Sequence, residues 1–126
     1  AARFDAPEQS LEHAQERKYA RMLELTGAQP GEHLLEIGCG WGGFAEYAAR
    51  RGVRVIGLTL SREQLRYARA RLQRAGLADR VDLRLCDYRD FTGQVDHIAS
   101  IEMFEAVGQE YWPVFFDQVR RSLAPG

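Results

Sequence analysis

A glycine-rich segment directly behind an apolar run constrains the fold of this chain more than any other feature. The segment is LEIGCGWGG, residues 35–43, in which four of nine positions are glycine. The residues that lead into it, HLLEIGC, show little polar alternation, which is typical of a strand buried in a parallel sheet. Phe44, Tyr47 and Ala48 follow at helical spacing. A strand, a bare turn and a helix in this order predict the start of an α/β sheet.

Three further apolar segments predict strands, at residues 53–60 (VRVIGLTL), 81–86 (VDLRLC) and 95–101 (VDHIASI). We therefore predict a doubly wound, Rossmann-like α/β fold in one domain, 1–126, with an N-terminal helix at 10–26 and a core at 33–126. We expect this domain to be truncated after the fourth strand and the helix that follows it. The fourth strand would then be an exposed edge at which copies of the chain can associate.

Capping residues predict where the helices begin. Ser10 is expected to cap the first helix, and Ser61 with Gln64 forms the S-x-x-Q pattern of a capping box. Pro113 suits the first turn of a last helix. The residues predicted to face inward from the first helix are Leu11, Ala14, Met22 and Leu25, with Tyr19 and Leu23 beside them; those from the helix after Ser61 are Leu65, Ala68, Leu72 and Ala75.

Composition excludes several classes of protein. A formal net charge of -1 provides no general attraction for nucleic acid. No apolar run approaches the ~18 residues of a membrane span, and no signal-like segment opens the chain, so we expect a cytoplasmic protein. Cys39 and Cys86 form no cluster with the scattered His13, His33 and His97, so neither a disulfide framework nor a metal site is expected.

The carboxyl ends of parallel strands form the usual ligand-binding edge of such a fold. Four segments follow predicted strands at this edge: residues 38–43, 59–64, 87–89 and 102–108. Gly38, Gly40 and Gly43 satisfy the pattern G-x-G-x-x-G, in which a bare backbone and a helix N-terminus can approach an anion. This pattern alone is a weak signal, because several nucleotide cofactors use it.

Two carboxylates favour one cofactor over the others. A nicotinamide dinucleotide would require an acidic residue about 20 positions after the glycines, where this chain has none. NADP stays an alternative at this point, because Arg62 could bind its 2′-phosphate. Glu36 would repel a pyrophosphate but suits the cationic groups of S-adenosylmethionine, and Asp87 can accept from an adenine amino group beside Tyr88. The plain alternatives are that Glu36 faces solvent and that Asp87 caps a turn.

Four motifs together point to a family. LLEIGCGWGGFAEYAA, VIGLTLSREQ, CDYRDF and SIEMFEAVG, in this order and spacing, resemble cyclopropane-fatty-acyl-phospholipid synthases and the related mycolic acid methyltransferases. SLEHAQERKYARMLE resembles the helix before their cofactor loop, so the likeness covers essentially the whole chain. The resemblance implies a class I S-adenosylmethionine-dependent methyltransferase fold. It also implies transfer of a methylene group to the double bond of an unsaturated phospholipid acyl chain.

Site residues follow from the same resemblance. It implies that Glu105 helps to hold a bicarbonate ion beside the transferred methyl group, which makes Glu105 the predicted catalytic residue. The chain departs from the family pattern at two positions: Ala1 stands where some relatives have a cysteine that contacts bicarbonate, and Ala106 where many have a histidine. The residues implied to bind the cofactor are Gly38 and Gly40 at the methionine part, Thr59, Leu60 and Gln64 at the ribose, and Asp87 and Tyr88 at the adenine. Glu36 is predicted to bind the cofactor as well, because its negative charge suits a cationic ligand.

The resemblance leaves alternatives for the whole protein. A methyltransferase of the same family could act on another lipid or small molecule, and a cofactor-binding remnant could lack turnover. Because most of the acyl-chain pocket lies in family segments beyond this sequence, we expect the chain alone to be inactive. A phospholipid substrate also implies peripheral contact with the inner membrane surface, for which no segment of this chain is plainly amphipathic.

Overall fold

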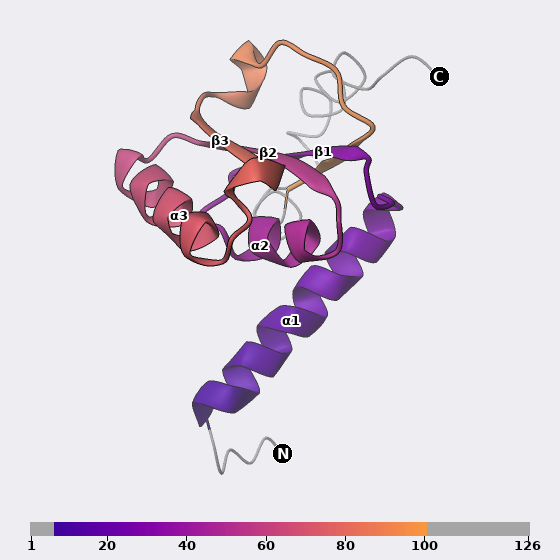
Figure 1. Ribbon diagram of the computed structural model, residues 1–126, viewed down its shortest axis with the longest axis vertical. Helices are drawn as coiled ribbons and strands as arrows, with labels where there is room; N and C mark the ends of the chain where they lie inside the picture. Colours follow the sequence, from indigo (N-terminus) through magenta and orange to yellow (C-terminus); the bar gives the residue numbers. More distant parts are fainter. Residues whose placement is uncertain (1–6, 101–126) are drawn as a thin grey trace, which may run out of the picture.

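The computed structural model describes residues 7–100, which form one parallel sheet with helices (Figure 1). The strand order is β3-β2-β1-β4. The strands are β1 (His33–Ile37), β2 (Arg54–Thr59), β3 (Val81–Leu85) and β4 (His97–Ala99). The helices are α1 (Pro7–Thr26), α2 (Gly43–Arg50) and α3 (Arg62–Arg74), with the short 3-10 turns η1 (Ala78–Arg80) and η2 (Tyr88–Asp90).

The strand order reverses direction at β1, which is the position where this class of fold binds ligands. The chain runs from β1 outward to β2 and β3, and then returns to place β4 on the other side of β1. Leu35 of β1 therefore pairs with Ile56 on one side and with Ile98 on the other. At such a reversal the connections leave a crevice uncovered outside the carboxyl ends of the strands. This crevice is the expected ligand-binding site.

Alternate residues of the central strands pack on opposite faces of the sheet. Leu34 and Val55 are buried with Phe44 of α2 and Met22 of α1. The other face contains the buried side chains Leu35, Ile37, Leu58, Phe91 and Val95. In Figure 1, α1, α2 and α3 lie on one side of the sheet, and the chain between β3 and β4 lies on the other. The two-residue period of a strand thus assigns each β1 side chain to one of these faces.

The first helix differs from its prediction in its start and in its buried face. It begins at Pro7, so Ser10 lies inside the helix and is not its N-cap; proline is favoured in the first turn because it lacks the N–H that would be left unpaired there. The side chains of Leu11 and Leu25 are 64% and 66% exposed. The N-terminal half of α1, which contains Leu11, projects beyond the sheet layer (Figure 1), whereas Tyr19, Met22 and Leu23 pack on it and Leu25 is on the outer side of the helix.

The third helix agrees with its prediction at its start and on its inward face. Ser61 is the N-cap, and its Oγ accepts a hydrogen bond from the Gln64 backbone N–H at 3.1 Å. Ala68 and Leu72 are buried as predicted. The alternation predicted for the third strand is only partly present, because β3 is at a sheet edge: Leu83 is buried and Leu85 is 40% exposed.

The helix predicted after Pro113 lies outside the described residues. None of the helices in the described part combines the length and the apolar character of a membrane span.

Candidate functional site

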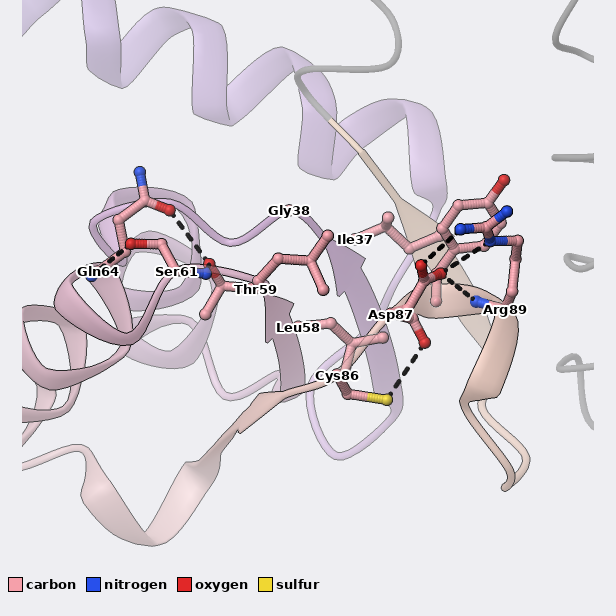
Figure 2. Close-up of a pocket in the computed structure, with 11 residues that line it drawn as sticks. Ile37, Gly38, Leu58, Thr59, Ser61, Gln64, Cys86, Asp87 and Arg89 are labelled. Atoms are coloured by element: carbon pink, nitrogen blue, oxygen red, sulfur yellow. Dashed lines mark hydrogen bonds and ion pairs between the residues drawn. The ribbon is translucent and has the colours of Figure 1, made fainter.

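A cavity of about 580 Å³ lies at the carboxyl edge of the sheet (Figure 2). It joins three of the four segments that the sequence predicted to meet there, namely those that follow β1, β2 and β3. The fourth, residues 102–108, lies outside the described residues. The lining residues are Ile37, Gly38, Leu58, Thr59, Leu60, Ser61, Gln64, Cys86, Asp87, Tyr88 and Arg89.

The turn after β2 is held together by the hydroxyl of Thr59. Its Oγ1 donates to Oε1 of Gln64 at 3.1 Å and accepts from the backbone N–H of Ser61 at 3.1 Å (Figure 2). The capping box is therefore only half formed, because the Ser61 N–H pairs with Thr59 and not with the Gln64 side chain. This arrangement leaves the amide N–H donors of Gln64 for a ligand and places its side chain in one orientation.

Asp87 has both of its carboxylate oxygens engaged by Arg89. Oδ1 accepts from the backbone N–H of Arg89 at 2.9 Å and from Nε at 3.1 Å, while Oδ2 accepts from Nη2 at 2.7 Å. The side-chain and backbone hydrogen bonds from Arg89 lower the pKa of Asp87 from 3.8 to about 2. Asp87 is also the N-cap of η2. The turn-capping alternative is therefore correct, and the residue lines the cavity as well.

The glycine loop meets the cavity at one position. Gly38, which has φ +75°, lines the cavity, whereas Gly40 is not among its lining residues. The backbone N–H of Cys39 donates to the Leu58 carbonyl at 2.7 Å, which fixes the loop against β2. Gly42, outside the G-x-G-x-x-G pattern, has φ +89°, and a Cβ at this position would lie 3.0 Å from the Cβ of Ala68, so α3 packs directly on the loop.

Glu36 is placed differently from both sequence-based expectations. Its side chain is 2% exposed, so it does not face solvent, and it is not among the residues that line the cavity. It alternates with Leu35 and Ile37, which pack on the face of the sheet opposite α2. Its carboxylate lies close enough to raise the pKa of Tyr19, whose main cause of elevation is burial. The cavity geometry therefore gives no support to a direct contact between Glu36 and a bound cofactor.

The cavity brings together most of the residues predicted to bind a cofactor. Those that line it are Gly38, Thr59, Leu60, Gln64, Asp87 and Tyr88. Their contacts with a cofactor stay a prediction, as does the role of Glu105, which lies outside the described residues. The sequence placed Ser61 and Arg89 in segments at this edge without assigning them a role, and it did not identify Ile37, Leu58 and Cys86 as lining residues. The position of Ile37 and Leu58 near strand ends at the binding edge was an available signal, whereas Arg89 offered only its proximity to Asp87.

The chemistry of the lining fits S-adenosylmethionine better than a dinucleotide. Among the described lining residues Arg89 carries the one cationic side chain, and Asp87 already engages it. A pyrophosphate would therefore meet a carboxylate and no available cation. Arg62, which the sequence left open as a partner for a 2′-phosphate, is not among the lining residues. The apolar side chains around Leu58 and Tyr88, with acceptors at Asp87 and donors at Gln64, suit a nucleoside.

The chain is similar over its whole length to one protein family. The family model for mycolic acid cyclopropane synthetase matches residues 1–126. The tuberculostearic acid methyltransferase UfaA1 of Mycobacterium tuberculosis is 48% identical over 92% of this chain and 27% of its own length. The cyclopropane-fatty-acyl-phospholipid synthase of Escherichia coli strain K12 is 43% identical over 92% of this chain and 30% of its own length. The chain thus spans less than a third of each of these relatives.

A solved structure gives the same result for the fold. The mycolic acid cyclopropane synthase CmaA1, crystallised with S-adenosylhomocysteine (SAH) and CTAB, has a TM-score of 0.79 and 33% identity, over 96% of this chain and 43% of that one. The parallel sheet described above is accordingly the class I methyltransferase fold predicted from the sequence. The chain belongs to the mycolic acid cyclopropane synthetase family of S-adenosylmethionine-dependent methyltransferases.

Proposed function

We propose that the full-length protein transfers a methylene group from S-adenosylmethionine to the double bond of an unsaturated phospholipid acyl chain and so forms a cyclopropane ring. The observation that carries the proposal is the cavity in which the segments after β1, β2 and β3 meet, together with membership of the family. The similarity to the Escherichia coli cyclopropane-fatty-acyl-phospholipid synthase supports the choice of substrate.

The cofactor would supply a methyl group made electrophilic by the sulfonium charge. In this chain Gly38 would lie beside its methionine part, Gln64 would donate to the ribose hydroxyls, and Asp87 would accept from the adenine amino group. Thr59, which is 5% exposed, would act through Gln64 because its hydroxyl is already bonded within the turn. The described residues thus bind and orient, and none of them is assigned a proton transfer.

The reaction explains why a family member needs further groups beyond this cavity. An alkene is a weak nucleophile, and its attack on the methyl carbon leaves a carbocation that must lose a proton as the ring closes. The site must therefore stabilise positive charge, exclude water and provide a base. The proposal assigns Glu105 to this part of the reaction, with bicarbonate as the group that it would hold. It also implies contact of the full-length protein with the membrane surface.

The product identifies the reaction. The full-length protein is expressed in a host whose phospholipids contain unsaturated but not cyclopropane acyl chains, and the lipids are analysed by mass spectrometry. We expect a gain of one CH₂ per modified chain with loss of the double bond. Mild catalytic hydrogenation distinguishes the outcomes, because a retained double bond takes up two hydrogens and a cyclopropane ring does not. An O-methyl or N-methyl product would reject the proposal.

A second candidate is methylation of a lipid without ring closure. It is favoured by the 48% identity to a tuberculostearic acid methyltransferase. The same experiment separates the two candidates, since a methylated alkene has the mass of the cyclopropane product but consumes hydrogen. Calorimetric titration with SAH tests the cofactor assignment independently of the acceptor. Binding of NADPH without binding of SAH would refute it, whereas SAH binding without any product would indicate a cofactor-binding protein that lacks turnover.

A further inference from the structure

The Asp87 carboxylate is held by one neighbour from two directions. The backbone N–H of Arg89 fixes Oδ1, and the guanidinium of the same residue reaches Oδ1 through Nε and Oδ2 through Nη2 (Figure 2). A carboxylate that accepts from a backbone group and a guanidinium at once cannot rotate without breaking charge-assisted bonds. The orientation of Asp87 is therefore a property of Arg89 as much as of its own backbone.

This arrangement leaves Asp87 able to accept but not to donate. Its pKa of about 2 keeps the group ionised at neutral pH. Each carboxylate oxygen has more than one acceptor position, so a further donor can still bind beside Arg89. The side chain of Asp87 is 22% exposed and lines the cavity, whereas that of Arg89 is 66% exposed. The more exposed residue thus supports the less exposed one.

The surroundings indicate what kind of group would meet this acceptor. Ile37, Leu58 and Tyr88 line the cavity together with Asp87, so this end offers apolar surface and one ionised acceptor. A purine ring can lie against apolar side chains and present one polar edge. An exocyclic amino group on that edge would donate to Asp87, whereas an oxo group in the same place would put two acceptors against each other.

We propose that Arg89 is a positioning residue that selects the nucleobase: by fixing Asp87 as an oriented acceptor, it makes this end of the cavity bind a 6-amino purine and reject a 6-oxo purine. The inference rests on the proposed cofactor site and adds to it the residue that controls base specificity. Arg89 itself needs no contact with the ligand.

The test compares two ligands on matched variants of the full-length protein. Calorimetry measures the affinities for SAH and for S-inosylhomocysteine, its 6-oxo analogue. We expect the wild-type protein to prefer SAH by at least about tenfold, since a hydrogen bond to a charged group is at stake. Arg89→Gln should weaken SAH binding by roughly three- to tenfold and reduce the preference. Asp87 would still be ionised at pH 7 in this variant, so the reduction reports its orientation.

Two further variants make the result specific. Arg89→Lys keeps a cation that can make one hydrogen bond, and we expect it to restore part of the preference. Arg84→Gln is the control, because Arg84 binds Asp82 two residues away through Nε and Nη2 at 3.1 and 2.8 Å but does not line the cavity. We expect the control to leave both affinities unchanged. Melting curves verify that each variant folds, and Asp87→Asn, whose amide can donate to an oxo group, provides an independent loss of preference.

The outcomes are distinguishable. An unchanged ratio of affinities in Arg89→Gln overturns the inference, and the proposed cofactor site stands if Asp87→Asn still loses the preference. An equal loss of preference in Arg84→Gln overturns it too, because the effect would then be general. Failure of the wild-type protein to bind SAH overturns the proposed cofactor role and this inference with it.

Discussion

Replacing Thr59 by valine should separate the stability of the turn after β2 from its ability to bind a cofactor. The substitution keeps the shape and the β-branching of the side chain, so strand packing changes little. It removes the two hydrogen bonds of 3.1 Å that join Thr59 to Ser61 and Gln64 in a residue that is 5% exposed. At about 0.5–1.5 kcal/mol for each bond, the free energy of unfolding should fall by about 1–3 kcal/mol.

The effect on binding follows from the side chain that Thr59 holds. Without its partner, Gln64 regains rotamer freedom that a bound ribose would have to remove. Immobilising such a side chain costs about 0.5–1.5 kcal/mol, so the affinity for SAH should fall by roughly two- to tenfold. Urea unfolding followed by circular dichroism measures the first effect, and calorimetry on the folded protein measures the second.

The chain contains a matched control at the end of α1. Thr26 also donates through Oγ1, to the Leu23 carbonyl at 2.6 Å, and accepts from the backbone N–H two residues later, that of Ala28, at 3.1 Å. Thr26→Val should therefore destabilise the protein comparably and leave SAH affinity unchanged. Thr59 does not position Gln64 for the cofactor if Thr59→Val binds SAH as tightly as the wild-type protein, or if Thr26→Val weakens binding to the same extent.

Three further predictions concern packing, pH and association. Gly43→Ala should destabilise the protein by about 1–3 kcal/mol, because its Cβ would overlap Tyr19 Oη and lie 2.9 Å from Tyr19 Cζ. In a double-mutant cycle, Gly43→Ala should cost less when Tyr19 is replaced by phenylalanine. An equal cost in both backgrounds would contradict this explanation. NMR titration should give Asp87 a pKa near 2 that rises toward 3.8 in Arg89→Gln. Because the pKa is lowered in the folded state, the Asp87–Arg89 pair stabilises the fold above about pH 4, and this stabilisation is lost as the pH falls through 2. An unchanged Asp87 pKa in Arg89→Gln would exclude Arg89 as the cause of the low pKa. Among the described strands β4 is an edge, so we predict that this 126-residue chain associates through residues 97–99; light scattering should show dimers, and a monomer at high concentration would count against it.

Local patterns predicted the elements around the cavity well. The strand before Gly38, the helix after it and the cap at Ser61 all depend on residues within four positions of one another. Such contacts form in the same way wherever the segment is placed, so their residue types reveal them. Apart from the cap expected at Ser10, the predictions that failed concerned burial and depended on distant neighbours. The buried face of α1 is an example: Leu11 is in the N-terminal half, which extends past the sheet layer, whereas Leu25 is close to the sheet but is exposed on the outer side of the helix.

The placement of Glu36 shows the same limit at the site itself. Sequence reasoning assigned its charge to the ligand because the residue directly precedes the glycines. The strand period instead turns the side chain toward the face covered by α1 and α2, where it influences Tyr19. The cofactor assignment therefore no longer depends on that carboxylate. It depends on the cavity beside Asp87 and on the family, which the four sequence motifs together had indicated.

The sequence by itself determined the strand–turn–helix order, the capped turn after β2 and the family, because these are recorded in residue types at short fixed spacings. The sequence also predicted that the segments after β1, β2 and β3 meet, but only the tertiary structure decided which of their residues share the cavity: Gly38 lines it, whereas Gly40 and Glu36 do not. The tertiary structure also decided that Arg89 donates hydrogen bonds to both carboxylate oxygens of Asp87. Burial and orientation are properties of packed neighbours, and a linear pattern specifies neighbours only within a few residues.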